Sequence, residues 1–116
     1  MVAHVVLFRP RPELTDTERA QFVDAFEDAI RNIPLIRRAR VGRRITMGRA
    51  YDEHNAEEFP FAAILEFETE ADLREYLNHP AHQRLGEQFY FAAERALVFD
   101  FVLSEDARTV LSESRS

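Results

Sequence analysis

The segment from Tyr76 to His82 contains the residues of this sequence best suited to chemistry. Two histidines, His79 and His82, flank a Pro-Ala pair, and Tyr76 precedes the second histidine by six residues. Pro80 disfavours a helical conformation for His79 and suits the first position of a new helix. We therefore expect one helix to end near Leu77 and another to begin at Pro80, so that Tyr76 and His82 converge. A histidine and a tyrosine at one point can move a proton or bind an oxygen atom; the alternative is that the tyrosine only packs and the histidines cap helices.

Two further polar residues lie inside apolar stretches. His4 interrupts the run from Val2 to Phe8, and Asp100 interrupts the run from Arg95 to Leu103. A carboxylate is costly to bury without a partner, so Asp100 requires a hydrogen-bond donor, and a histidine would serve. A histidine in a core strand is more often held by a local hydrogen bond than catalytic.

The remaining pattern predicts the elements that hold these residues. Thr15 and Glu18 have the spacing of a capping box for a helix that ends near Asn32, and Thr69 caps a short helix that begins at Glu70. Runs of apolar and β-branched residues predict four strands, and apolar residues three to four apart predict the helices. The predicted strands are 2–8, 36–48, 59–68 and 95–103, and the predicted helices are 16–32, 70–77 and 80–93.

Arginine is concentrated in the second predicted strand. The five arginines are Arg37, Arg38, Arg40, Arg43 and Arg44. Their alternation with apolar residues predicts an edge strand with a solvated, charged face, and a basic patch that binds anions is the alternative. Residues 49–58 are polar and predict a mobile loop. Residues 104–116 predict a flexible polar tail after a single domain of residues 1–103.

The order of these elements, β-α-β-β-α-α-β, predicts an α+β fold of the ferredoxin-like, split βαβ type. Such a fold has a four-stranded antiparallel sheet with its helices on one face. The first, third and fourth strands are nevertheless apolar on both faces, and a bare apolar face of that size is rare on a soluble monomer. The sequence therefore predicts a homodimer in which two sheet faces pack about a two-fold axis as a dimeric α+β barrel.

The composition limits the classes of function. The 116 residues have a net charge of -6, no cysteine and ten phenylalanines. The acidic balance argues against nucleic-acid binding, and the lack of cysteine excludes disulfides and thiolate chemistry. No apolar run approaches the ~20 residues of a membrane span and the N-terminus does not resemble a signal peptide, so we expect a cytoplasmic protein with no membrane partner. The many phenylalanines can line a pocket for a small apolar or aromatic molecule.

Several motifs spread over residues 2–103 become informative in combination. They are the His-Val-Val-Leu-Phe start, Val41-Gly42, Leu65-Glu66-Phe67, Tyr76, His79-Pro80-Ala81-His82 and Val98-Phe99-Asp100-Phe101. Together they resemble the stress-responsive dimeric A/B-barrel (Dabb) family. The resemblance implies the same dimeric α+β barrel that the pattern of strands and helices predicts.

A characterised type of member of that family is a plant polyketide cyclase. It closes a linear tetraketide by an intramolecular aldol condensation and uses no metal or organic cofactor. Its tyrosine, its second motif histidine, its first-strand histidine and its last-strand aspartate match, in that order, Tyr76, His82, His4 and Asp100. Phe61 stands where the cyclase has a third-strand histidine, and Ala93 stands where it has a pocket tryptophan. The pocket of this chain therefore has a different shape, and the fold alone does not transfer the plant substrate.

We expect the pocket to lie between the helices and the sheet. Its predicted wall consists of Val6, Phe8, Phe22, Phe26, Ala63, Leu65, Leu85, Phe89 and Val98. In the catalytic hypothesis Asp100 accepts a hydrogen bond from His82, His82 removes a proton next to a carbonyl group, and Tyr76 donates to the oxygen that gains charge. His4 is then a secondary polar contact, and no cofactor is required.

Two other hypotheses use the same residues. In the first, which is our main prediction, the pocket binds a small apolar molecule and the biological role stays open. In the second, the pair of Asp100 and His82 is a structural tether without chemistry. We do not expect a metal site formed by His79, His82 and Asp100, because no supporting pattern of hydrogen-bond partners is evident around them.

Overall fold

The computed structural model describes residues 1–112. Four strands form one antiparallel sheet in the order β2-β3-β1-β4, which is the predicted ferredoxin-like, α+β arrangement. The strands are β1 (Val2–Pro10), β2 (Ile36–Arg43), β3 (Phe61–Phe67) and β4 (Ala93–Val102). The helices are α1 (Asp16–Asn32), α2 (Ala50–His54), α3 (Glu70–Leu77), α4 (Pro80–Ala92) and α5 (Ala107–Ser112).

Local chemistry sets the ends of the helices that cover the sheet. The backbone N–H of Glu18 donates to Oγ1 of Thr15 (3.1 Å) and the N–H of Thr15 donates to Glu18 Oε1 (2.8 Å), which confirms the capping box. Thr69 caps α3 as predicted. At the break between α3 and α4, the N–H of Ala81 donates to Nδ1 of His79 (3.0 Å), so His79 is the cap of α4. The predicted interruption before Pro80 is therefore present.

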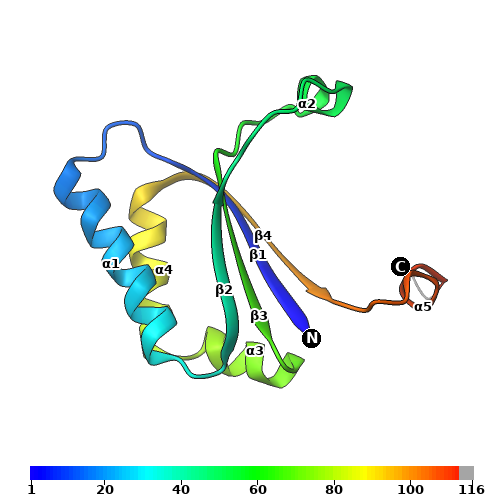
Figure 1. Ribbon diagram of the computed structural model, residues 1–116. Helices are drawn as coiled ribbons and strands as arrows, with labels where there is room; N and C mark the ends of the chain where they lie inside the picture. The colour runs from blue at the N-terminus through cyan, green and yellow to red at the C-terminus, as the bar shows by residue number, and fades with distance from the viewer. Residues whose placement is uncertain (113–116) are drawn as a thin grey trace.

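The helices pack on one face of the sheet, with α1 and α4 side by side and α3 at the end of the strands (Figure 1). The core between the two layers is formed by Val2, Ala29, Ile33, Leu65, Phe67, Leu73, Tyr76, Ala81 and Leu85. An aromatic cluster adds to this core. In it the Phe8 ring lies 5.0 Å from Phe89, 5.6 Å from Phe61 and 5.9 Å from Phe22, measured between ring centroids. Because β1 and both long helices contribute rings, the cluster fixes α1 and α4 on the sheet.

Beyond β2 the chain leaves the sheet as an arm that contains α2 (Figure 1). The predictions of a strand reaching Gly48 and of an irregular loop over 49–58 are wrong there. The carboxylate of Asp52 accepts hydrogen bonds from the N–H groups of Met47 (2.8 Å) and Arg49 (3.1 Å). These local bonds start a helical turn that no apolar periodicity announces.

The predicted polar tail is also not irregular throughout, because it contains α5. Asp106 starts this helix by accepting from the N–H of Arg108 (3.0 Å) and from the hydroxyl of Thr109 (2.6 Å). Residues 113–116 of the predicted tail lie outside the described residues.

The arginine-rich strand β2 lies at one edge of the sheet, as predicted. Two arginines of this strand form ion pairs, Arg37 with Glu68 (3.3 Å) and Arg40 with Glu66 (3.0 Å). Arg44, directly after the strand, pairs with Glu58 (2.7 Å). These pairs favour a solvated charged face over an anion-binding patch.

The second face of the sheet carries no helix in the described part of the chain (Figure 1). Its side chains are nonetheless mainly apolar, namely Val5, Leu7, Ala62, Ile64, Leu97, Phe99 and Phe101. The accessible surface is 8542 Å², whereas a compact monomer of 13.5 kDa exposes about 6,500 Å². The radius of gyration is 15.8 Å, against about 13 Å for a compact domain of this length. One subunit therefore leaves apolar surface that it cannot bury by itself.

Candidate active site and ligand cavity

A cavity of 620 Å³ lies between α4 and the helix-covered face of the sheet. Seven of the nine predicted wall residues line it: Val6, Phe26, Ala63, Leu65, Leu85, Phe89 and Val98. Its volume and its largely apolar lining are those of a site for a small organic molecule.

Two predicted wall residues, Phe8 and Phe22, are not in the lining, so this part of the prediction is wrong. Both belong to the aromatic cluster, where the Phe22 ring lies 5.4 Å from Phe89 and 5.9 Å from Phe8. Neighbouring rings of the cluster cover Phe8 and Phe22. Phe89 belongs to the same cluster but also lines the cavity.

Three polar side chains meet at one end of the cavity. Tyr76 from α3 lies between His4 of β1 and His82 of α4, with ring centroids 5.8 Å and 4.7 Å away and both contacts edge-on. Phe67 packs against Tyr76 at 5.0 Å. All three polar residues line the cavity. The structure thus brings Tyr76 and His82 together across the helix break.

Asp100 does not bond to His82, contrary to the prediction. Nδ1 of His4 donates to Oδ1 of Asp100 at 2.6 Å, because the register of β1 and β4 places these two residues directly opposite each other. Asp100 is not in the cavity lining. Its carboxylate therefore orients the buried imidazole of His4 and leaves Nε2 of that ring as the free nitrogen.

The Tyr76 hydroxyl is a hydrogen-bond donor that is open to the cavity. Only 1% of the residue is exposed, and burial raises the pKa of the phenol well above its usual value, so the proton stays on the oxygen at neutral pH. Among residues 1–112 no hydrogen bond uses this hydroxyl, whereas every fully buried side-chain polar atom there has a partner. The hydroxyl oxygen is therefore not fully buried. Because Tyr76 lines the cavity, the hydroxyl is available to a ligand there.

His82 is half-buried in the same place, and its imidazole hydrogen-bonds to the backbone of Leu77. Burial lowers its pKa below the usual value near 6.5, the nearby His4 lowers it further, and the backbone of Leu77 opposes the shift. At pH 7 His82 is consequently neutral and can accept a proton. His79 instead uses its Nδ1 to accept the bond that caps α4. Among residues 1–112, no three histidine, aspartate or glutamate side chains are grouped closely enough to hold a metal ion.

A family model described as "Stress responsive A/B Barrel Domain" (Dabb) matches residues 2–103. This chain belongs to the Dabb family. Olivetolic acid cyclase of Cannabis sativa is 22% identical over 100 residues, which cover 86% of this chain and 94% of the cyclase. None of the helices described in this Dabb chain is long and apolar enough to cross a membrane.

Solved structures share the fold. The hydroxynitrile lyase of Passiflora edulis superimposes with a TM-score of 0.76 at 20% identity, covering 90% of this chain and 94% of the lyase. A protein from Bacteroides fragilis is described as dimeric and of ferredoxin-like fold, and it superimposes with a TM-score of 0.61 at 25% identity. The match covers 88% of this chain and 95% of the Bacteroides fragilis chain. These similarities establish the Dabb fold and leave the activity to be argued from the site.

Sequence reasoning missed the second end of the cavity in this Dabb chain. Arg11, Glu94 and Arg95 line that end, and the backbone N–H of Arg11 donates to the carbonyl of Ala92 at 2.8 Å. In the sequence, Arg9-Pro10-Arg11-Pro12 follows the predicted strand 2–8 and indicates only where that strand ends. The pairing of Pro10 with Ala93, which brings Arg11 to the cavity, follows from the register of β1 and β4.

Two other hollows occur among the described residues. One, of 670 Å³, lies between α1 and α4 and is lined mostly by charged and amide side chains. The other, of 530 Å³, lies on the helix-free face beside the arm. Neither has a histidine or tyrosine in its lining, so the cavity beside Tyr76 is the candidate functional site.

The lowered pKa of His82 predicts a pH-dependent stability term. The pKa of His82 is lower in the folded protein than in the unfolded chain, where it is about 6.5. At pH values between these two pKa values, His82 is protonated in the unfolded chain and mostly neutral in the folded protein. The free energy of unfolding should therefore fall as the pH falls below about 6.5, and His82→Gln should reduce this slope. Urea unfolding of both proteins from pH 5 to pH 8 measures the difference, and NMR titration of the His82 ring gives its pKa directly. An equal slope in the two proteins, or a pKa of His82 at or above 6.5, would contradict the assignment.

Proposed function

We propose that this Dabb-family protein is a homodimer that binds a small apolar or aromatic molecule in the cavity beside Tyr76. The observation that supports binding most strongly is the lining itself. Aliphatic and phenylalanine side chains form most of the wall, and the Tyr76 hydroxyl and the imidazoles of His4 and His82 converge at one end. Such a combination gives affinity through burial of apolar surface and orientation through a few polar contacts.

The helix-free face of the sheet supports the dimer. It retains roughly half-exposed rings at Phe99 (48%) and Phe101 (51%), and β4 also exposes Val98 and Val102 toward its other face. Apolar surface on both faces of one edge strand would expose a lone subunit to aggregation. Packing of two such faces at about 10 Å, as in stacked sheets, buries these side chains.

A second copy of this chain is the proposed occupant of that face. The Bacteroides fragilis relative of the same fold is described as dimeric. The arm with α2 and the segment with α5 both extend on the side of the sheet opposite α1 and α4, where a partner would lie between them (Figure 1). The hollow beside the arm, lined in part by Leu7, Ala62 and Leu97, adds apolar surface to the same face.

Cofactor-independent cyclase or lyase chemistry is the second candidate, and the contact of Tyr76 with two imidazoles favours it. Neutral His82 would remove a proton from the carbon next to a carbonyl group, and the resulting enolate carbon would attack a second carbonyl of the same molecule. The Tyr76 hydroxyl would donate to the oxygen that becomes negative, and the proton held by His82 would return to that alkoxide. His4, oriented by Asp100, would supply a second polar contact to the substrate.

The dimer is tested by mass and by one substitution in the face. We expect the protein to sediment at twice its 13.5 kDa chain mass, and Phe101→Glu to shift it to monomer because a buried carboxylate is costly. Val23→Glu on α1 is the control, since Val23 is similarly exposed (49%) but lies on the helix side. Analytical ultracentrifugation from 1 to 100 µM distinguishes the outcomes. A wild-type monomer throughout, or an unchanged dimer in Phe101→Glu, would contradict the proposed interface.

Occupation of the cavity is tested at Gly86, which lines it on α4. A Cβ at Gly86 would meet no atom within 4 Å, so Gly86→Ala should fold and gain about 0.5–1 kcal/mol of stability. Gly86→Leu should instead fill part of the cavity and weaken binding of the neutral fluorescent probe N-phenyl-1-naphthylamine by about tenfold. Fluorescence titration of the three proteins measures this. Equal affinity in the wild type and Gly86→Leu, or no binding at all, would place the ligand elsewhere or exclude it.

The enzymatic candidate is tested with a linear β-polyketo thioester for ring closure and an aromatic hydroxynitrile for cleavage. If the wild type turns over either compound, Tyr76→Phe should lower kcat by about 100-fold, because it removes the donor to the developing oxyanion and keeps the ring. Tyr51→Phe on the exposed helix α2 is the control and should have no effect. No turnover by the wild type, or equal kcat in Tyr76→Phe, would reject this candidate and leave ligand binding.

A further inference from the structure

The cavity has two chemically different ends. His4, Tyr76 and His82 form one end, and Arg11, Glu94 and Arg95 lie at the other. His4 pairs with Asp100 and Pro10 pairs with Ala93, so the two ends are separated along β1 and β4. The six steps of extended chain from His4 to Pro10 in β1 span about 20 Å between Cα atoms. The cavity is therefore elongated, with apolar walls between two polar ends.

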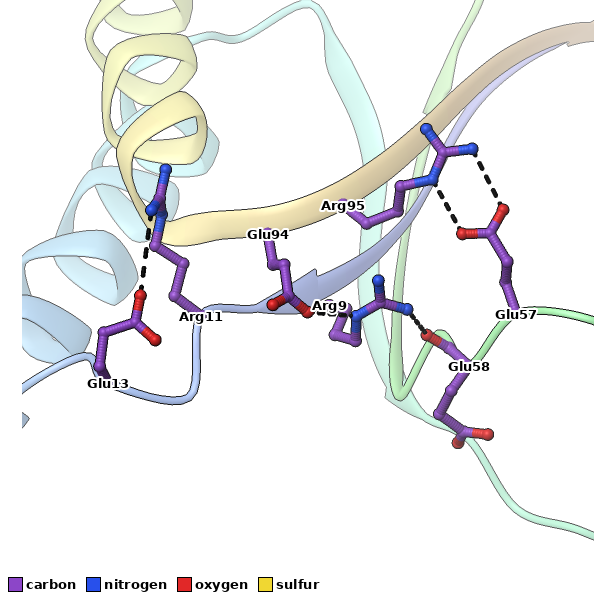
Figure 2. Close-up of polar contacts among 7 residues, drawn as sticks. All are labelled: Arg9, Arg11, Glu13, Glu57, Glu58, Glu94 and Arg95. Atoms are coloured by element: carbon purple, nitrogen blue, oxygen red, sulfur yellow. Dashed lines mark hydrogen bonds and ion pairs between the residues drawn. The ribbon is translucent and has the colours of Figure 1, made fainter.

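Most charges at the second end are already neutralised by close partners (Figure 2). Arg9 donates through Nε to Glu94 at 2.7 Å and also to the backbone carbonyl of Glu58 at 2.8 Å. Arg95 makes two hydrogen bonds to the carboxylate of Glu57, at 2.8 and 3.1 Å. These two ion pairs leave Glu94 and Arg95 with little capacity to bind a further charge.

Arg11 is different from both. Its nearest carboxylate among the described residues is that of Glu13, at 3.9 Å, a distance too long for a hydrogen bond (Figure 2). Arg11 lines the cavity and its side chain is about half exposed (47%), so the guanidinium lies at the open margin of the cavity, with its hydrogen-bond donors unused by the described residues.

The backbone of Arg11 is held in place although its side chain is not. Proline on both sides, at Pro10 and Pro12, restricts the backbone conformation. The N–H of Arg11 donates to the carbonyl of Ala92 at the end of α4, and its carbonyl accepts from the N–H of Leu14 (3.4 Å). A guanidinium on such an anchored backbone loses less freedom when it binds an anion.

We propose that Arg11 binds the carboxylate of the ligand, and that the natural ligand is an elongated, mainly apolar carboxylic acid. The planar guanidinium suits a carboxylate in a two-pronged contact. With its carboxylate at Arg11, such a ligand extends along the apolar walls and places its far end beside Tyr76 and His82. This inference rests on the proposed binding function and specifies the ligand class for it.

The test compares 6-phenylhexanoate with 6-phenylhexanamide at pH 7.5 by isothermal titration calorimetry on the full chain. The two molecules have the same length and shape and differ in charge. We expect the carboxylate to bind about tenfold more tightly than the amide, as a charge-assisted contact provides, and to weaken with added salt. Arg11→Gln should reduce carboxylate affinity about tenfold and leave the amide unchanged, which also shows that the variant is folded.

Arg31→Gln is the matched control. Arg31 pairs with Glu27 at 3.9 Å, the same distance as in the Arg11–Glu13 pair, but it does not line this cavity. It should leave both affinities unchanged. Equal binding of acid and amide by wild type and Arg11→Gln, or tighter binding of 6-phenylhexylamine than of the acid, would overturn this inference and leave the binding function. No binding of acid, amide or amine would overturn both.

Discussion

The whole structure depends on one constraint: a sheet with apolar side chains on both faces has helices on only one of them. The covered face supplies the floor of the cavity, because α4 and the sheet enclose it between them. The other face, with Val5, Leu7 and Phe101, is left without a covering layer in one subunit, and the proposed second copy would cover it. The pairing of β4 with β1 places Asp100 opposite His4, which it orients, and Val98 opposite Val6, with both valines in the cavity lining.

The interruption between α3 and α4 has the same importance for the polar end of the cavity. A continuous helix would place Tyr76 and His82 six residues apart, more than one and a half turns and on different sides. The cap by His79 and the following proline redirect the chain, so that the two rings meet edge-on. Burial then makes Tyr76 a persistent donor and His82 a neutral acceptor at the same point. Local sequence chemistry thus produces a site that neither helix could form alone.

Features encoded by neighbouring residues could be predicted from the sequence. These include the Thr15 cap, the break at Pro80, the two apolar faces and most of the cavity wall. Features that depend on which residues of distant strands are paired could not. The register of β1 with β4 decides that Asp100 bonds to His4 instead of His82, and it brings Arg11 to the cavity. The arm was also missed, since a single carboxylate, Asp52, starts its helix without an apolar pattern.

The central claim, that the helix-free face packs on a second copy, is tested most directly by isotope-filtered NMR. Equal amounts of ¹³C-labelled and unlabelled protein are mixed, and contacts between labelled and unlabelled subunits are recorded. The proposed dimer predicts intermolecular NOEs between the methyl groups of Val5, Leu7 or Ile64 and the rings of Phe99 or Phe101. A spectrum without such NOEs at these residues, or with intermolecular NOEs confined to α1 and α4, would contradict it.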